Sequence, residues 1–86
     1  MMTKSIVLTA PNGLHARPVG ELVKLAKTLD GKVMLSNGVK TVAATSMLGV
    51  LSLGLKSGSE VHLTSEGGSE AANLEAVAQF IAQIKE

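Results

Sequence analysis

The residues best suited to chemistry lie together in one short segment near the N-terminus. Residues 13–18 read Gly-Leu-His-Ala-Arg-Pro, so a histidine and an arginine stand two positions apart just after a glycine. A neutral imidazole is a nucleophile that can accept a phosphoryl group, and a planar guanidinium matches the arrangement of phosphate oxygens. His15 and Arg17 therefore indicate phosphoryl chemistry, with a helix-capping histidine beside a solvated arginine as the alternative.

A helix is expected to begin directly after His15. The apolar residues that follow recur at positions i, i+3, i+4 and i+7, which predicts an amphipathic helix. Pro18 suits the first helical turn, where a missing N–H costs nothing. We expect Gly31 to lie just past the end of this helix. The predicted apolar stripe consists of Val19, Leu22, Val23 and Ala26.

The start of this helix would give His15 surroundings suited to phosphate. Helix N-termini present backbone N–H groups and the positive end of the helix dipole, which together bind anions. With His15 as the cap, the N–H groups of Ala16 and Arg17 could donate to a phosphoryl group. The dipole and the Arg17 charge both disfavour a second positive charge, so they favour the neutral, nucleophilic imidazole.

The remaining residues predict strands and helices in a simple alternation. Residues 4–10 read as a strand, and residues 32–36 and 39–43 as a hairpin closed by a type I′ turn at Asn37-Gly38. Ser46 can cap a short helix over residues 47–53, closed by Gly54. Residues 60–65 alternate like a strand, and Ser69 can cap a last helix whose apolar stripe is Leu74, Val77, Ile81 and Ile84.

The order β-α-β-β-α-β-α predicts an α+β fold in which helices cover one face of a four-stranded sheet, a two-layer sandwich. A length of 86 residues allows one domain, spanning residues 1–86. His62 alternates with core-facing Val61 and Leu63, so we expect it on the outer face of its strand in a structural role.

Composition excludes several classes of function. There is no cysteine, and two histidines without carboxylates at helical spacing provide no ligand set, so we expect no metal and no cofactor. The net charge is +1 and Phe80 is the only aromatic residue, which argues against nucleic-acid binding. No apolar stretch approaches the ~20 residues of a spanning helix. We expect a soluble cytoplasmic protein without membrane insertion.

Two motifs together resemble HPr, the histidine-containing phosphocarrier family of the bacterial sugar phosphotransferase system. Residues 13–18 are similar to its active-site signature. Residues 45–54, Thr-Ser-Met-Leu-Gly-Val-Leu-Ser-Leu-Gly, are similar to the signature around its regulatory serine. The resemblance runs from Lys4 to Ile84. It implies an open-faced sandwich with an antiparallel sheet, in which the first and last strands are neighbours.

The resemblance also implies roles for individual residues. His15 would carry the phosphoryl group on Nδ1, taking it from Enzyme I, which is charged by phosphoenolpyruvate, and passing it to a sugar-specific Enzyme IIA. Arg17 would stabilise the phosphorylated state. Ser46 would be a target of a serine kinase and phosphorylase, and the modified form would bind a catabolite-control regulator. Such a monomeric carrier takes part in phosphotransferase reactions without being a free-standing enzyme.

An apolar patch on the short helix is the candidate partner surface. The helix has five apolar residues besides its glycine and serine, which is more than two helical turns can bury on one side. Val50 and Leu53 are assigned to the core, and some of Met47, Leu48 and Leu51 should be exposed. The resemblance implies that this patch, rimmed by Arg17, Lys24 and Lys27, docks Enzyme I and Enzyme IIA. From the residues alone, the two lysines equally fit a solvated helix face.

The sequence departs from the family at two positions and leaves two alternatives open. Thr45 stands where lysine is common, which removes a positive charge near the partner surface, and Val19 stands where alanine is common. One alternative is a regulatory binding module of the same fold acting through Ser46. The other is a carrier for a nitrogen-related or dihydroxyacetone-kinase branch, although the Ser-Met-Leu-Gly run at 46–49 favours the sugar branch.

Overall fold

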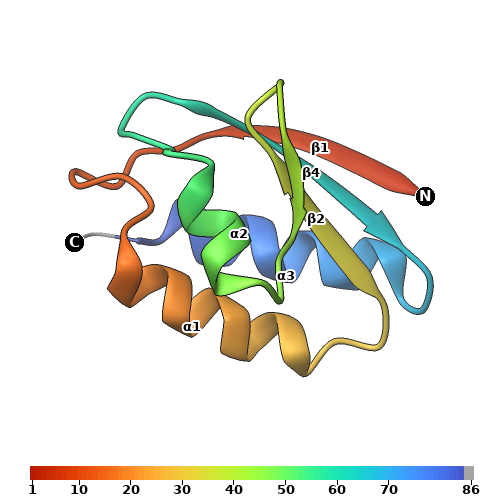
Figure 1. Ribbon diagram of the computed structural model, residues 1–86. Helices are drawn as coiled ribbons and strands as arrows, with labels where there is room; N and C mark the ends of the chain where they lie inside the picture. Colours follow the sequence, from red (N-terminus) through yellow and green to blue (C-terminus); the bar gives the residue numbers. More distant parts are fainter. Residues whose placement is uncertain (85–86) are drawn as a thin grey trace.

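The computed structural model describes residues 1–84 and contains the predicted succession of strands and helices (Figure 1). The first strand and helix are β1 (Met2–Val7) and α1 (Ala16–Lys27). The hairpin is formed by β2 (Lys32–Ser36) and β3 (Thr41–Ala43). The short helix α2 (Met47–Ser52), the strand β4 (Glu60–Glu66) and the helix α3 (Glu70–Ala82) complete the order β-α-β-β-α-β-α.

The strands form one antiparallel sheet in the order β1-β4-β2-β3, so the first and last strands of the chain are neighbours, as the resemblance implied. Helix α3 packs on β1, β4 and β2, while α1 packs on α2 and α3. The helices therefore cover one face of the sheet and leave the other face open (Figure 1). The predicted α+β open-faced sandwich is confirmed.

Alternation along β4 separates the core from the open face. Val61 and Leu63 are fully buried against the helices, while His62 and Thr64, which alternate with them, are partly exposed on the other side. Burial of one such aliphatic side chain contributes roughly 1.5–3 kcal/mol. The predicted stripe of α3 is buried as well. The largest fully buried apolar side chains are Leu8, Val19, Leu22, Leu35, Val50, Val61, Leu63, Val77 and Ile81.

Several predicted boundaries shift. The strand predicted over residues 39–43 begins only at Thr41, and the strand predicted over residues 60–65 extends to Glu66. β1 begins earlier and ends at Val7, not at residue 10. The Leu8 N–H still donates to Ser59 O at 2.8 Å, and the Gly58 N–H donates to Leu8 O at 2.7 Å, so the chain turns away only after Leu8. Helix α2 ends at Ser52 with Leu53 as its C-cap. Gly54 follows with φ +61°, the left-handed conformation expected of a closing glycine.

The prediction that Gly31 closes α1 is wrong. The helix ends at Lys27, and Thr28 takes the C-cap position, with both its N–H and its hydroxyl donating to Leu25 O. Gly31 does not have a positive φ. A side chain at Gly31 would overlap the backbone carbonyl of Gly67. The glycine is therefore explained by close approach of two chain segments, a tertiary requirement that helix-end rules do not contain.

The predicted type I′ turn at Asn37-Gly38 is also wrong. That turn requires a positive φ at both residues, and no described residue other than glycine has one. The connection is instead a four-residue loop in which Asn37 N–H donates to Lys40 O at 3.2 Å. The Asn37 Oδ1 accepts from the N–H groups of Val39 and Lys40 at 2.9 and 2.8 Å. The side chain thus organises the loop in place of a two-residue turn.

Ser69 precedes α3 as predicted, but its hydroxyl does not cap the helix. Asp30 binds this end instead. Its carboxylate accepts from the Ser69 N–H at 3.0 Å, the Ser69 hydroxyl at 3.1 Å and Asn73 Nδ2 at 2.8 Å. These bonds, the Ser69 N–H foremost, lower the pKa of Asp30 below its ordinary value because they favour the charged carboxylate. Asp30 thereby connects the segment that follows α1 to the start of α3.

Candidate functional site

His15 takes the N-cap position of α1, as the sequence predicted. Its backbone is extended, with φ −96° and ψ −178°, and its carbonyl accepts from the Val19 N–H at 3.0 Å to begin the helix. The imidazole makes no capping hydrogen bond to the first turn. The half-buried ring therefore stands at the helix start without being used to cap it.

The loop that carries His15 is anchored on the segment that follows α2. The Gly13 N–H donates to Ala10 O and the Leu14 N–H donates to Leu55 O, both at 3.0 Å, and the Leu14 side chain is buried. Gly13 has a φ of +68°. A Cβ at this position would lie 2.5 Å from Leu55 O and 2.9 Å from the Cα of Lys56. Conformation and contact both require glycine two residues before His15.

The tautomer of His15 decides which ring nitrogen can act as a nucleophile. Nδ1 lies 3.4 Å from Gly13 O, at the long limit of a hydrogen bond. A neutral ring with its proton on Nδ1 would donate weakly to that carbonyl. A neutral ring with its proton on Nε2 exposes the Nδ1 lone pair. Nucleophilic attack through Nδ1 therefore uses the Nε2–H form, and the Gly13 contact is weak enough to be given up.

The first turn of α1 is suited to an anion. Ala16 and Arg17 are both exposed there, and Pro18 is buried in the same turn. The first turn contains no acidic residue that would offset the positive dipole end, and the basic residues Lys24 and Lys27 lie in the last turn. The structure thus brings His15, Ala16 and Arg17 together at one helix start, where backbone donors and a guanidinium can converge on phosphate oxygens.

Ser46 is the N-cap of α2, as predicted. Its exposed hydroxyl accepts from the Gly49 N–H at 3.1 Å, and its carbonyl accepts from the Val50 N–H at 2.9 Å. The six residues of α2 span roughly 9 Å at 1.5 Å per residue. Leu55, which binds the His15 loop, follows the other end of α2. Ser46 therefore lies at the opposite end of α2 from the segment that anchors the His15 loop.

The predicted apolar patch is carried mainly by Leu48, whose side chain is 83% exposed, and by Met47, which is 40% exposed. Leu51 is half-buried against the core, and Val50 and Leu53 are buried as predicted. Exposed Lys24 and Lys27 lie on α1, which packs beside α2 (Figure 1). Apolar and basic side chains therefore occur on two neighbouring helices.

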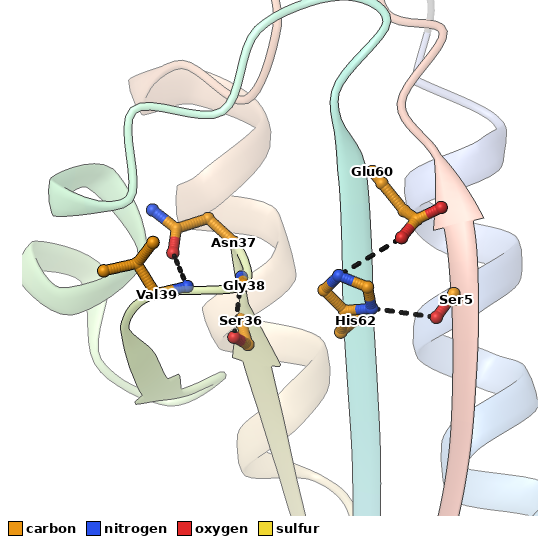
Figure 2. A network of polar contacts seen from close by, with 7 residues as sticks. All are labelled: Ser5, Ser36, Asn37, Gly38, Val39, Glu60 and His62. Atoms are coloured by element: carbon orange, nitrogen blue, oxygen red, sulfur yellow. Dashed lines mark hydrogen bonds and ion pairs between the residues drawn. The ribbon is translucent and has the colours of Figure 1, made fainter.

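Sequence reasoning missed three polar contacts outside the His15 loop. Asn37 Nδ2 donates to Leu53 O at 3.1 Å and so ties the β2–β3 loop to the end of α2. His62 lies on the open face, as predicted, but its ring has two polar neighbours, Ser5 and Glu60 (Figure 2). Strand alternation places each residue on that face. Only the register between β1 and β4 shows that Ser5 and His62 stand opposite each other.

No helix formed by residues 1–84 is long and apolar enough to cross a membrane. The structure is a small antiparallel open-faced sandwich with a histidine at the start of its first helix. Comparisons with known proteins assign the family to which such a chain belongs. Residues 2–83 match the family model described as the PTS HPr component phosphorylation site. The match covers almost the whole chain.

Three relatives illustrate the similarity. The phosphocarrier protein HPr of Vibrio cholerae is 37% identical over 67 residues, which are 78% of this chain and 79% of that protein. A crystal structure of HPr from Bacillus anthracis superposes with a TM-score of 0.88 at 32% identity, covering 93% of this chain and 95% of that one. An HPr dimer from Thermoanaerobacter tengcongensis has a TM-score of 0.72 at 32% identity, over 91% and 92% of the two chains.

This chain belongs to the HPr family, the phosphocarrier proteins of the phosphotransferase system.

Proposed function

We propose that this protein relays a phosphoryl group from Enzyme I, charged by phosphoenolpyruvate, through His15 to a sugar-specific Enzyme IIA. The observation that carries the proposal is the position of His15. Its imidazole precedes α1, makes no capping bond, and stands beside the exposed first-turn residues Ala16 and Arg17. A histidine used only as a cap would point its ring nitrogen at a first-turn N–H.

The proposed transfer is a direct displacement at phosphorus. The Nδ1 lone pair of His15 attacks the phosphorus of the phosphohistidine on Enzyme I, and the N–P bond to Enzyme I breaks as the new one forms. The N–H groups of Ala16 and Arg17, the Arg17 guanidinium and the helix dipole stabilise the charge on the phosphoryl oxygens. Attack by a histidine of Enzyme IIA then restores His15. The carrier has no free-standing turnover.

Partner docking is proposed for the exposed apolar side chains of α2 and the basic side chains of α1. Met47 and Leu48 supply apolar area, with Leu51 at its margin, and Lys24 and Lys27 supply positive charge beside it. An exposed apolar residue beside cations fits an acidic partner surface with an apolar centre. Thr45, next to Ser46, contributes no charge, so the two lysines and Arg17 provide the attraction.

Regulation is proposed at Ser46. An exposed hydroxyl at a helix start is accessible to a serine kinase, and a phosphate there would be stabilised by the dipole of α2. The modified form would slow transfer and bind a catabolite-control regulator. A protein acting only through Ser46 is the second candidate, because Ser46 and Leu48 are exposed independently of His15. A nitrogen-related or dihydroxyacetone-kinase branch would use the same His15 chemistry with other partners.

We further propose that the protein acts in the cytoplasm as a monomer. Measurement of intact mass tests the relay. Incubation with Enzyme I and phosphoenolpyruvate is expected to add one acid-labile phosphoryl group, which His15→Ala abolishes. His62→Ala is the matched control, because it removes the other imidazole from the open face. Labelling that persists in His15→Ala and disappears in His62→Ala would overturn the proposal.

A further inference from the structure

Three polar side chains form a cluster on the open face of the sheet, away from the helices (Figure 2). The Ser5 hydroxyl lies 2.9 Å from His62 Nδ1, and His62 Nε2 lies 3.2 Å from the Glu60 carboxylate. A hydroxyl, an imidazole and a carboxylate are thus in contact in that order. The same order of groups activates serine nucleophiles in unrelated enzymes.

Sheet register creates this arrangement. Ser5 of β1 stands directly opposite His62 of β4, and Glu60 lies two residues before His62 on the same face. Ser36 of β2 stands opposite His62 on the other side, but its hydroxyl accepts from the Gly38 N–H at 3.0 Å. The His62 ring contacts Ser5 (Figure 2). His62 therefore has a serine opposite it on each neighbouring strand, and of these two it is Ser5 whose hydroxyl contacts the imidazole.

The carboxylate fixes the tautomer of the imidazole. Glu60 can only accept, so a neutral His62 ring is most stable with its proton on Nε2, facing Glu60. Nδ1 then holds the lone pair and accepts from the Ser5 hydroxyl. In this state His62 is oriented as a general base for Ser5, and Glu60 stabilises the positive charge that the ring acquires when it takes the proton.

We propose that Ser5 is a second nucleophilic site, which takes an acyl group from activated esters. The Ser5 Oγ attacks the carbonyl carbon, and its proton passes to His62 Nδ1. The tetrahedral adduct then expels the alcohol part of the ester as an oxyanion, leaving an acyl ester on Ser5, and the imidazolium returns its proton to water. His62 is 40% exposed and Glu60 is 60% exposed, so water can reach the imidazolium and take its proton.

The experiment uses p-nitrophenyl acetate as the probe. Because the imidazole of His15 can also attack this ester, the His15→Ala protein serves as the parent. Phenolate release is followed by absorbance, and peptide mapping locates the acetyl group. Hydroxylamine treatment distinguishes a serine ester, which it cleaves, from acetylated lysine, which it does not. Ser36 serves as the matched control, because it lies on the same face and also stands opposite His62.

The expected result is acetylation of Ser5 at least tenfold faster than of Ser36, in hydroxylamine-sensitive form. His62→Gln is expected to slow it by at least tenfold, which is well below the ~10²-fold or more that a positioned base supplies. Glu60→Gln is expected to slow it less. Equal labelling of Ser5 and Ser36, or unchanged labelling in His62→Gln, would overturn the proposal.

The His15 relay is tested separately from this site. Ser5→Ala in the otherwise unaltered chain is expected to accept a phosphoryl group from Enzyme I at the parental rate, since the backbone hydrogen bonds that anchor the His15 loop run to Ala10 and Leu55, outside β1. Ser5→Ala also checks the labelling, because acetylation that continues elsewhere at the same rate in this variant would contradict the assignment to Ser5.

Discussion

Substituting Gly13 by alanine is expected to damage both stability and phosphoryl acceptance, whereas the same change at Gly54 should damage stability alone. Both glycines are left-handed, with φ +68° and +61°. They differ in their surroundings. A Cβ at Gly13 would lie 2.5 Å from Leu55 O, whereas a Cβ at Gly54 would meet nothing within 4 Å. The pair therefore separates backbone conformation from contact.

The magnitudes follow from these two terms. A left-handed alanine costs roughly 1–2 kcal/mol, and this term applies to both variants. Gly13→Ala must also move the loop away from the 53–56 segment, which breaks the Leu14–Leu55 hydrogen bond and costs about 0.5–1.5 kcal/mol more. We expect Gly54→Ala to lose roughly 1–2 kcal/mol of unfolding free energy, and Gly13→Ala to lose about 1.5–3.5 kcal/mol.

Urea unfolding measures the first quantity, and the rate of phosphohistidine formation with Enzyme I and phosphoenolpyruvate measures the second. Gly13→Ala should slow phosphorylation under conditions where the variant remains folded, because the displaced loop carries His15. Gly54→Ala should be phosphorylated at the parental rate. If the two variants lose equal stability and both transfer normally, contact with Leu55 does not position the His15 loop.

Three further predictions concern the other features. Ser46→Asp keeps a capping side chain, so circular dichroism should be unchanged while phosphorylation by Enzyme I slows; the effect should shrink with added salt. Leu48→Asp should fold normally because Leu48 is 83% exposed, yet raise the dissociation constant for Enzyme I about tenfold or more, measurable by calorimetry; parental affinity would exclude this patch. Because the pKa of Asp30 is lower in the folded protein than its ordinary value of 3.8, the ionised carboxylate stabilises the fold at pH values above 3.8. This stabilisation is lost as the pH falls through the lower pKa of the folded state. Unfolding of Asp30→Asn should therefore depend less on pH below 4 than unfolding of the parent.

Local sequence rules predicted the elements and the position of His15 at a helix start because each depends on neighbours in the chain. The stripe of α1, the cap at Ser46 and the alternation of β4 are decided within a few residues, and all three are confirmed. Gly31 and Asn37 were misread because their conformations depend on distant partners. Gly67 approaches Gly31, and Leu53 accepts from Asn37. No local pattern reports those partners.

The same limit applies to the polar residues of the site and of the open face. His15 and Arg17 could be found because a helix start and a two-residue spacing are sequence properties. The cluster at His62 could not, because Ser5 is 57 residues away and meets the ring only through the sheet register. Its residues belong to strands whose alternation was predicted correctly. The resemblance implied that these strands are neighbours, but it did not give the register that places Ser5 opposite His62.

The carboxylate of Asp30 has a consequence for the kinetics of the fold. It joins residues up to 43 positions apart, Asp30 to Asn73, so its hydrogen bonds form only after both chain segments have docked. Interactions that form after the transition state leave the folding rate almost unchanged and instead slow unfolding. Asp30 should therefore slow unfolding and lengthen the lifetime of the native state. That lifetime sets how long the His15 loop stays assembled between encounters with its partners.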